Sequence, residues 1–321
     1  MESIGALAAN LLSPIILAFV LGVFASLVRS DLRLPEGLYS SLSIYLLLAI
    51  GLKGGVELSK TPLSEFVGPA LLTLGLGILT PITAYNVLRK LGRFDRENAA
   101  AIAAHYGSVS AVTFIVAITF GSMTGQVPEG FMPTLVAILE VPAIVVALMI
   151  AFTRAKRAGS WKEALHEVLA GRSVVLLVGG VLIGWAVGPA GFEPVAPFFA
   201  AGFQGALTLF LLEMGIVAAR RLKDLREVGV FLVGFGILVP ILHGLLAVWL
   251  GSLVGLSVGG SAVLGAMVSS ASYIAAPAAV RIALPEANPT FYLTASLGIT
   301  FPFNVTLGIP LYFTFAQWFC C

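Results

Sequence analysis

Ten long apolar segments follow one another along this chain, and they constrain its fold more than any other feature. Each is close to the length of about 20 residues that a helix needs to cross a hydrocarbon layer of ~30 Å. Lipid offers no partners to open backbone groups, so a crossing segment of this kind must be helical. We therefore predict an all-α polytopic membrane protein with ten transmembrane helices, spans 1 to 10, near residues 10–28, 37–58, 66–88, 98–120, 131–153, 173–189, 198–219, 228–252, 259–280 and 290–317.

Composition supports a membrane protein and excludes a soluble domain. Of the 321 residues, 59% are hydrophobic and 11% are charged, whereas a soluble domain is about 25% charged. A soluble core of this size could not bury so much apolar surface, but a bilayer can accept it. The net charge of +2 says little about partners, and we expect no nucleic acid among them. Residues 1–10 lack the Lys and Arg of a signal peptide, and Cys320 and Cys321 do not fit a prenylation motif.

The basic residues fall on one side of the predicted membrane. If the ten spans alternate in direction, sixteen of the eighteen Lys and Arg residues lie in loops on one side, and only Lys53 and Lys60 lie on the other. Loops rich in Lys and Arg stay in the cytoplasm. The prediction is a multi-pass protein of the plasma membrane, the inner membrane of a bacterium, with both termini outside.

The two halves of the chain resemble each other. The segment from Gly75 to Pro81 in span 3 matches the segment from Gly234 to Pro240 in span 8, and similar pairs link spans 2 and 7, 4 and 9, and 5 and 10 at offsets of about 160 residues. Five spans per half turn the second copy over in the membrane, and such inverted repeats are typical of secondary transporters. Close helix packing also explains the glycines of spans 3 and 8. We predict a first repeat at 1–157, a cytoplasmic connector at 158–172 and an inverted second repeat at 173–321.

The connector itself has a helical pattern. Ser160 and Glu163 have the spacing of a capping box, and Trp161, Leu165, Val168 and Leu169 fall on one helix face. The sequence therefore predicts a short amphipathic helix on the inner membrane surface, which anchors the joint between the halves.

Spans 4 and 9 contain short polar patches, which run from His105 to Thr113 and from Ser269 to Pro277. Pro277 lacks a backbone N–H and clashes with the preceding turn, which breaks a helix. We predict two broken helices that cross, whose hydroxyls and open N–H groups replace the hydration shell of a small anion. Alternatively, each serine bonds only to carbonyls of its own helix. The candidate substrate-binding residues are Gly107, Ser108, Ser110, Thr113, Ser269, Ser270 and Ser272.

A few charged residues lie at membrane depth, where each charge costs about 3 kcal/mol on insertion scales. Glu140, just before Pro142 in span 5, is the first candidate for binding a cation such as Na⁺ or for carrying a proton. Glu213 in span 7 is the second. Lys53 in span 2 either extends its ammonium to the membrane surface or pairs with an acid and takes the place of a coupling cation. His243 in span 8 is expected to form a hydrogen bond across helices. Apart from Na⁺ at Glu140, we expect no cofactor.

Four stretches carry a resemblance to a known family. They are Gly51-Leu-Lys-Gly-Gly55, Pro240-Ile-Leu-His243-Gly244, the segment Pro285-Glu-Ala-Asn-Pro289 between Arg281 and Tyr292, and Gly308-Ile-Pro310-Leu. With them the whole chain resembles the sodium-dependent bicarbonate transporter family, best known from cyanobacteria. The resemblance implies core and gate subdomains, an elevator-like movement, a homotrimer and sodium-coupled uptake of bicarbonate. It also maps the substrate region of the family onto Gly107, Ser108, Ser110 and 269–272, and its acid before proline onto Glu140.

Three features depart from the pattern of that family. Tyr273 stands where the family has an aspartate after the serine cluster, and Lys53 stands where it has a neutral residue. Losing a carboxylate and gaining an ammonium both disfavour Na⁺, so the coupling ion stays open between Na⁺, H⁺ and none. The connector is short, which disfavours docking of the PII-like cytoplasmic regulator that the resemblance implies.

The prediction is a secondary transporter for bicarbonate or a similar small inorganic anion, and not an enzyme. One alternative is an intramembrane serine hydrolase, with Ser108 or Ser110 as nucleophile and His105 or His243 as base. His105 is badly placed for that role, because a helix does not aim a side chain at a hydroxyl three or five residues further on. A second alternative is a membrane sensor that binds the anion without transporting it.

Overall fold

The computed structural model describes residues 12–152 and 161–320, and within these ranges the chain is helical with short connections and no strand. From the N-terminus the first helices are α2 (Pro14–Leu27), α3 (Glu36–Leu58), α4 (Leu63–Lys90), α5 (Arg96–Gly107), α6 (Ala111–Met123), α7 (Met132–Phe152) and α8 (Trp161–Leu169). They are followed by α9 (Arg172–Phe192), two short helical turns at Glu193–Val195 and Pro197–Ala201, α10 (Phe203–Leu222), α11 (Leu225–Leu253), α12 (Val258–Val268) and α13 (Ala276–Ala283).

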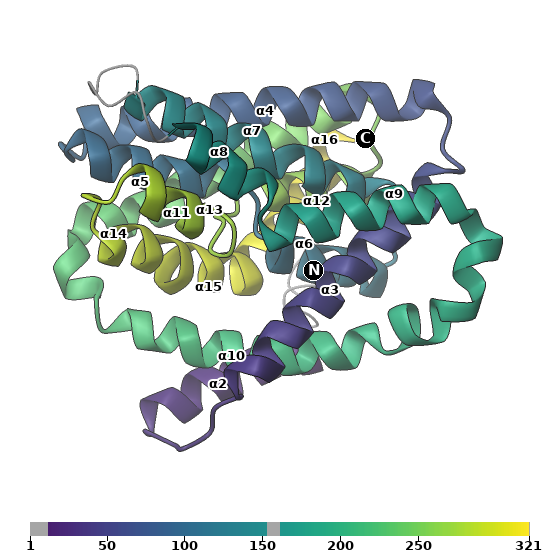
Figure 1. Cartoon of the computed structure of the whole chain (residues 1–321), viewed down its shortest axis with the longest axis horizontal. Helices are drawn as coiled ribbons and strands as arrows, with labels where there is room; N and C mark the ends of the chain where they lie inside the picture. Colours follow the sequence, from purple (N-terminus) through teal and green to yellow (C-terminus); the bar gives the residue numbers. More distant parts are fainter. Residues whose placement is uncertain (1–11, 153–160, 321) are drawn as a thin grey trace.

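The last helical stretch covers residues 289–319 and alternates between α-helical and wider π-helical turns. Its segments are α14 (Pro289–Leu293), η3 (Thr294–Thr300), α15 (Phe301–Phe303), η4 (Asn304–Gly308) and α16 (Ile309–Phe319). Figure 1 shows α4 along the top of the molecule and α10 along the bottom, with most other helices between them.

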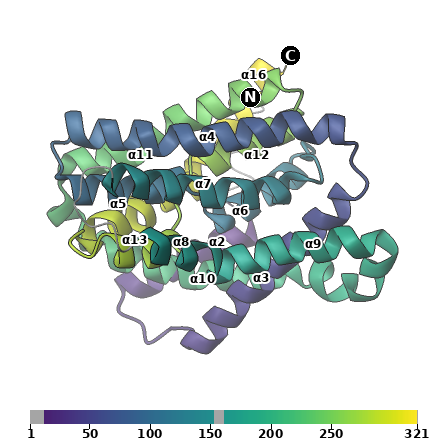
Figure 2. The same cartoon turned by 45° about the horizontal axis from the view of Figure 1, so that its top comes forward.

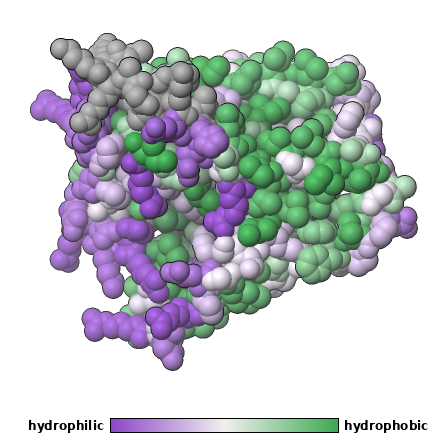
Figure 3. Space-filling model, viewed as in Figure 1, coloured by the Kyte–Doolittle hydropathy of each residue, from purple (hydrophilic) through white to green (hydrophobic). Residues whose placement is uncertain are grey.

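The predicted spans fall on helices, with spans 4 and 9 each on two half-helices, and the multi-pass membrane character is confirmed. Among the described residues, seven helices are long and apolar enough to cross a membrane. Three shorter apolar helices, Pro14–Leu27, Met132–Ala147 and Val258–Val268, fall on predicted spans 1, 5 and 9. The count of ten spans and their inverted arrangement stay predictions. Figure 3 shows hydrophilic residues gathered at the end where Figure 1 labels α5 and α14, and apolar residues over much of the rest of that face.

Two pairs of long helices cross closely, and each pair joins the first half of the chain to the second. In the pair α2 and α10, a Cβ on Gly22 would overlap with the carbonyl oxygen of Leu212, and a Cβ on Gly215 would overlap with that of Phe19. In the pair α3 and α9, which cross in both views of Figures 1 and 2, Gly51 contacts Gly180. Backbones approach this closely in membranes only where side chains are absent.

Packing accounts for only some of the glycines of the repeated motif. A Cβ on Gly77 would come within 3.2 Å of Leu139, and one on Gly236 within 2.8 Å of Ile299. The packing explanation is therefore right for these two. The packing explanation is wrong for Gly75 and Gly234, because a Cβ on either would meet nothing within 4 Å.

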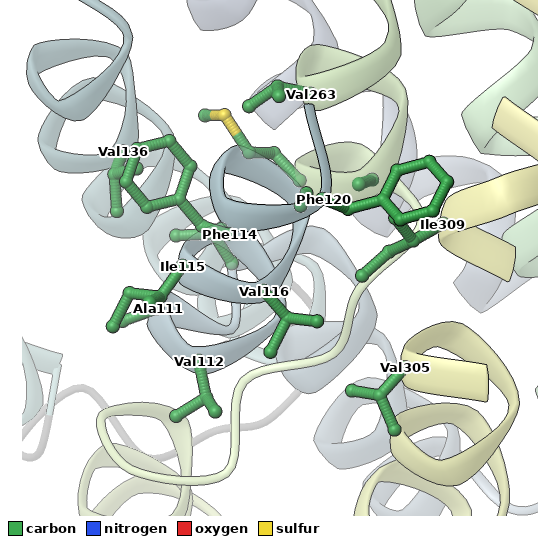
Figure 4. Packing of buried hydrophobic residues seen from close by; sticks show 14 of the residues in the cluster. Ala111, Val112, Phe114, Ile115, Val116, Phe120, Val136, Val263, Val305 and Ile309 are labelled. Atoms are coloured by element: carbon green, nitrogen blue, oxygen red, sulfur yellow. The ribbon is translucent and has the colours of Figure 1, made fainter. Parts of the chain in front are cut away.

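The broken span formed by α5 and α6 lies inside the protein. In the most apolar part of residues 96–123, 94% of the residues are buried. Figure 4 shows apolar side chains on all sides of α6, with Phe120 close to Val263 of α12 and Ile309 of α16. A helix that is apolar all round needs surroundings of protein or lipid. Because it is surrounded by protein, its backbone can be interrupted without exposing polar groups to lipid.

The predicted connector helix is confirmed as α8, in which Val168 is buried, whereas Leu169 is exposed. Its expected capping residue, Ser160, lies outside the described residues. That α8 lies on the inner membrane surface stays a prediction.

Candidate functional site

Two helix breaks meet inside the protein. The first separates α5 from α6 at residues 108–110, and the second separates α12 from α13 at residues 269–275. Hydrogen bonds join them: the Ser110 N–H donates to Ser270 Oγ at 2.8 Å, and the Ser272 N–H donates to the His105 carbonyl at 2.8 Å. We call this place the crossing. The two serine clusters, far apart in sequence, are therefore in direct contact.

A serine caps the second half of each broken helix. Ser110 Oγ accepts from the Thr113 N–H at 3.2 Å, and Ser272 Oγ accepts from the Ala276 N–H at 3.3 Å. The first N–H groups of a helix have no partner within that helix, and in α13 the Ala276 N–H is bound by Ser272 while Pro277 has none. The positive ends of α6 and α13 both lie at the crossing, where they favour negative charge.

Two more serines donate to carbonyls of their own helix. Ser269 and Ser270 donate to carbonyls of α12, those of Ala266 and Met267, at 3.0 and 2.6 Å. The local bonds are not their only ones, because Ser270 Oγ also accepts from the Ser110 N–H and Ser269 Oγ lies 3.4 Å from Asn304 Oδ1. Ser108 instead donates to the Glu140 carbonyl on α7 at 3.3 Å and so ties the first break to that helix. Of the other two predicted binding residues, Gly107 ends α5 and Thr113 is buried in the first turn of α6.

A small cavity lies at the crossing, with about 210 Å³ of empty space. Ser110 and Ser272 line it, together with Glu140 of α7, Tyr273 and Ser173 of α9. Glu140 is only 3% exposed, and among the described residues neither its Oε2 nor the Tyr273 hydroxyl has a hydrogen-bond partner. Buried polar atoms are rarely left unpaired, since each costs free energy. Two such atoms in one cavity indicate a place where a ligand binds.

The structure separates Lys53 and Glu213 from this cavity. Glu213 Oε2 accepts from the Leu34 N–H at 3.0 Å and lies in a pocket with Arg33 and Arg220. Lys53 lines another pocket, with Glu57 and Lys60. Neither residue is among those that line the crossing cavity, so of the predicted charged residues only Glu140 is near the serines.

The two histidines have positions that do not suit a hydrolase. His105 Nδ1 lies 2.6 Å from the Ser272 carbonyl, to which it donates, and its Nε2 has no hydrogen-bond partner in the described structure. His243 Nε2 lies 2.8 Å from Thr83 Oγ1 on α4. The expected bond of His243 across helices is thus confirmed. A serine nucleophile requires a base within hydrogen-bond reach, and neither ring forms such a bond with Ser108 or Ser110.

Sequence reasoning missed several buried polar residues around the crossing. Asn304 donates from Nδ2 to the Ser269 carbonyl at 3.0 Å and accepts from Tyr312 at 3.3 Å. An asparagine within an apolar span is a visible signal, so Asn304 could have been found. Ser173 is 4% exposed and lies in the first turn of α9. Nothing in the sequence marks it, because a serine near the start of a predicted span is ordinary.

Comparison with known families gives one match of nearly full length. The model of the Na⁺-dependent bicarbonate transporter superfamily matches residues 14–317. Comparison with curated proteins gives no match.

Proposed function

The chain belongs to the Na⁺-dependent bicarbonate transporter superfamily, and from this membership and the geometry of the crossing we propose that it is a cation-coupled importer of bicarbonate or a similar small anion. The observation that carries the proposal is the cavity between the two helix breaks, at the N-terminus of α6 and beside a buried carboxylate oxygen without a partner among the described residues. The substrate would lie between Ser110 and Ser272.

The cavity is far too small for an organic substrate. It leaves about 10 Å³ for water-sized spheres, room for about one water, against roughly 300–1,000 Å³ in pockets that bind drug-sized molecules. It must widen to admit even a small anion, and the hydroxyls of Ser110, Ser272 and Tyr273 that line it are donors that suit an oxyanion. They do not by themselves distinguish bicarbonate from other small anions.

Glu140 supports coupling to a cation or a proton by simple electrostatics. An anion and an ionised carboxylate about 4 Å apart repel each other by about 4 kcal/mol at an effective dielectric constant of 20. A cation bound to Glu140, or a proton on it, removes this repulsion. The anion therefore binds best together with its coupling ion, which is the thermodynamic basis of symport.

The donors near Glu140 fit Na⁺, since hard cations prefer oxygen ligands, and the cavity offers a carboxylate, serine hydroxyls and Tyr273. Because Tyr273 takes the place of a second carboxylate, the proposal includes H⁺ as the alternative coupling ion. Lys53 and Glu213 have no part in this step.

We propose that transport follows an elevator-like movement. The crossed pairs α2 with α10 and α3 with α9 would form the static gate, and the crossing with the helices around it would form the moving core. Ser173 supports this division, because it closes the cavity from α9, a gate helix. The ten-span inverted topology, termini outside and a homotrimer complete the proposal.

Tracer uptake by the purified protein in liposomes tests the function. We expect accumulation of labelled bicarbonate that requires an inward Na⁺ or proton gradient, with protein-free liposomes as control and other small anions as competitors. Saturable binding without flux would instead favour a sensor. Labelling of Ser108 or Ser110 by a fluorophosphonate probe would favour the hydrolase.

A further inference from the structure

A second and larger pocket lies at the end of the molecule opposite the arginine-rich loops. Its empty volume is about 1000 Å³. One wall comes from α3 and α9, with Lys53 and Phe192, and the other from α6, α7 and their connection, with Ile118, Glu129 and Pro133. We call it the Lys53 pocket. It therefore opens between the helices proposed as gate and those proposed as core.

The other charged groups in this pocket each have at least one hydrogen-bonded partner. Lys60 bonds to Glu57 Oε1 at 2.8 Å. Glu129 Oε1 accepts from the Ser257 N–H at 2.6 Å, directly before α12, where the helix dipole favours a negative charge. Lys53 is half-buried, and among the described residues no carboxylate lies within salt-bridge distance of its ammonium.

The only interaction that the described structure gives Lys53 is with an aromatic ring. Its Nζ lies 5.1 Å from the ring centroid of Phe203 on α10. A cation over a ring face gains about 1 kcal/mol, and this contact holds the side chain without neutralising its charge. The ammonium thus keeps its donors free for an anion.

The Lys53 pocket and the crossing lie along the same helix. Ile118 lines the pocket, and Ser110 caps the start of α6 at the crossing. Eight residues separate them, which is about 12 Å at 1.5 Å per residue. One helix therefore borders both the Lys53 pocket and the cavity that would bind the substrate.

From these observations we propose that Lys53 is the entrance site for the transported anion, which collects bicarbonate or a similar small oxyanion before it reaches the crossing. This inference depends on the proposed function. The walls around Lys53 are largely apolar, with Val56, Ile118 and Phe192, so the charge of the ammonium is screened less than it would be in bulk water. Of the two carboxylates in the pocket, Glu57 is paired with Lys60, and Glu129 is bound through Oε1 to the Ser257 N–H, while its Oε2 has no partner among the described residues.

The test compares Lys53→Met with a matched control in the same pocket, the double variant Glu57→Gln/Lys60→Met, which removes an ion pair and leaves the net charge unchanged. In liposome uptake we expect Lys53→Met to raise the KM for bicarbonate about tenfold, at the low end of electrostatic steering, and to leave the maximal rate unchanged. Lys53→Arg should keep the KM within about twofold of the parent, since it keeps the charge. The double variant should do the same. An unchanged KM in Lys53→Met, or an equal rise in the double variant, would overturn the proposal.

A second measurement does not depend on transport. Amine acetylation of the unmodified protein in detergent, followed by mass spectrometry, reports the reactivity of Lys53 and Lys60 separately. We expect bicarbonate, and nitrate as a second probe, to slow the acetylation of Lys53 severalfold and that of Lys60 not at all. Absence of protection by both anions would overturn the entrance site. Protection without any uptake would instead keep the anion site and reject the proposed transport.

Discussion

Glu140 and Lys53 both place one charge at membrane depth without an opposite charge beside it among the described residues, but their surroundings differ. Glu140 lies in a closed cavity of about 210 Å³, next to a second unpaired polar atom, on Tyr273. Lys53 lies in an open pocket of about 1000 Å³. In the closed cavity the charge needs a bound ion or a proton, whereas the ammonium in the open pocket is only half-buried. A charge without a counter-charge therefore supports ion coupling at Glu140 and recruitment of the anion at Lys53.

The largest effect is expected from Glu140→Gln. The amide keeps the size of the side chain and removes the charge that the coupling ion must neutralise, so the stimulation of uptake by an imposed Na⁺ or proton gradient should fall about a hundredfold or more. The matched control is Glu213→Gln, which keeps an acceptor for the Leu34 N–H in a separate pocket. Undiminished gradient-driven uptake in Glu140→Gln would show that the Glu140 carboxylate is not needed for coupling, and the proposed difference from Lys53 would be lost.

Tyr273→Phe is expected to have the next largest effect, and it sharpens the account of the closed cavity. If its hydroxyl binds the transported or coupling ion, its loss should lower uptake about tenfold, the value of one strong hydrogen bond. Thermal stability without substrate should not fall, because no partner in the described structure loses a bond. A control is Tyr312→Phe, whose hydroxyl bonds to Asn304. Unchanged uptake together with higher stability would mean that the Tyr273 hydroxyl has no ligand.

Ser110→Ala tests whether the start of α6 must be held in place. It removes a cap, which costs about 1 kcal/mol, and we expect roughly a fivefold loss of uptake with a modest drop in melting temperature. Ser122→Ala is the control, because Ser122 near the other end of α6 bonds only to its own helix, at the Ile118 carbonyl. Equal losses in both variants would show that the effect is not specific to the crossing.

The smallest effect is expected from ionic strength. Raising it from about 0.01 M to 0.15 M with an impermeant salt shortens the screening length from about 30 Å to 8 Å. The apparent KM should rise two- to threefold in the parent protein and not in Lys53→Met. The gradient dependence that Glu140 gives should stay the same, because a closed cavity excludes the salt. An equal salt effect on both properties would remove the distinction between the pockets.

Much of the fold could be predicted because hydrophobic length is a local property. Runs such as 37–58 and 228–252 became α3 and α11 with boundaries shifted by at most three residues. The two polar patches were recognisable as helix breaks, since Ser, Gly and Pro are conspicuous in an apolar span. Glu140 stood out for the same reason. Ser173 did not, because only folding brings the start of α9 beside α7.

The sequence by itself determined which segments are helices and where two of them break, because length, apolarity and proline act on the neighbouring backbone. Only the tertiary structure decided which polar groups meet. It placed Ser110 against Ser270, 160 residues away, and gave Ser269 and Ser270 local partners. It also separated Lys53 and Glu213 from Glu140. Contacts between helices depend on how whole helices pack, and no short stretch of sequence contains that information.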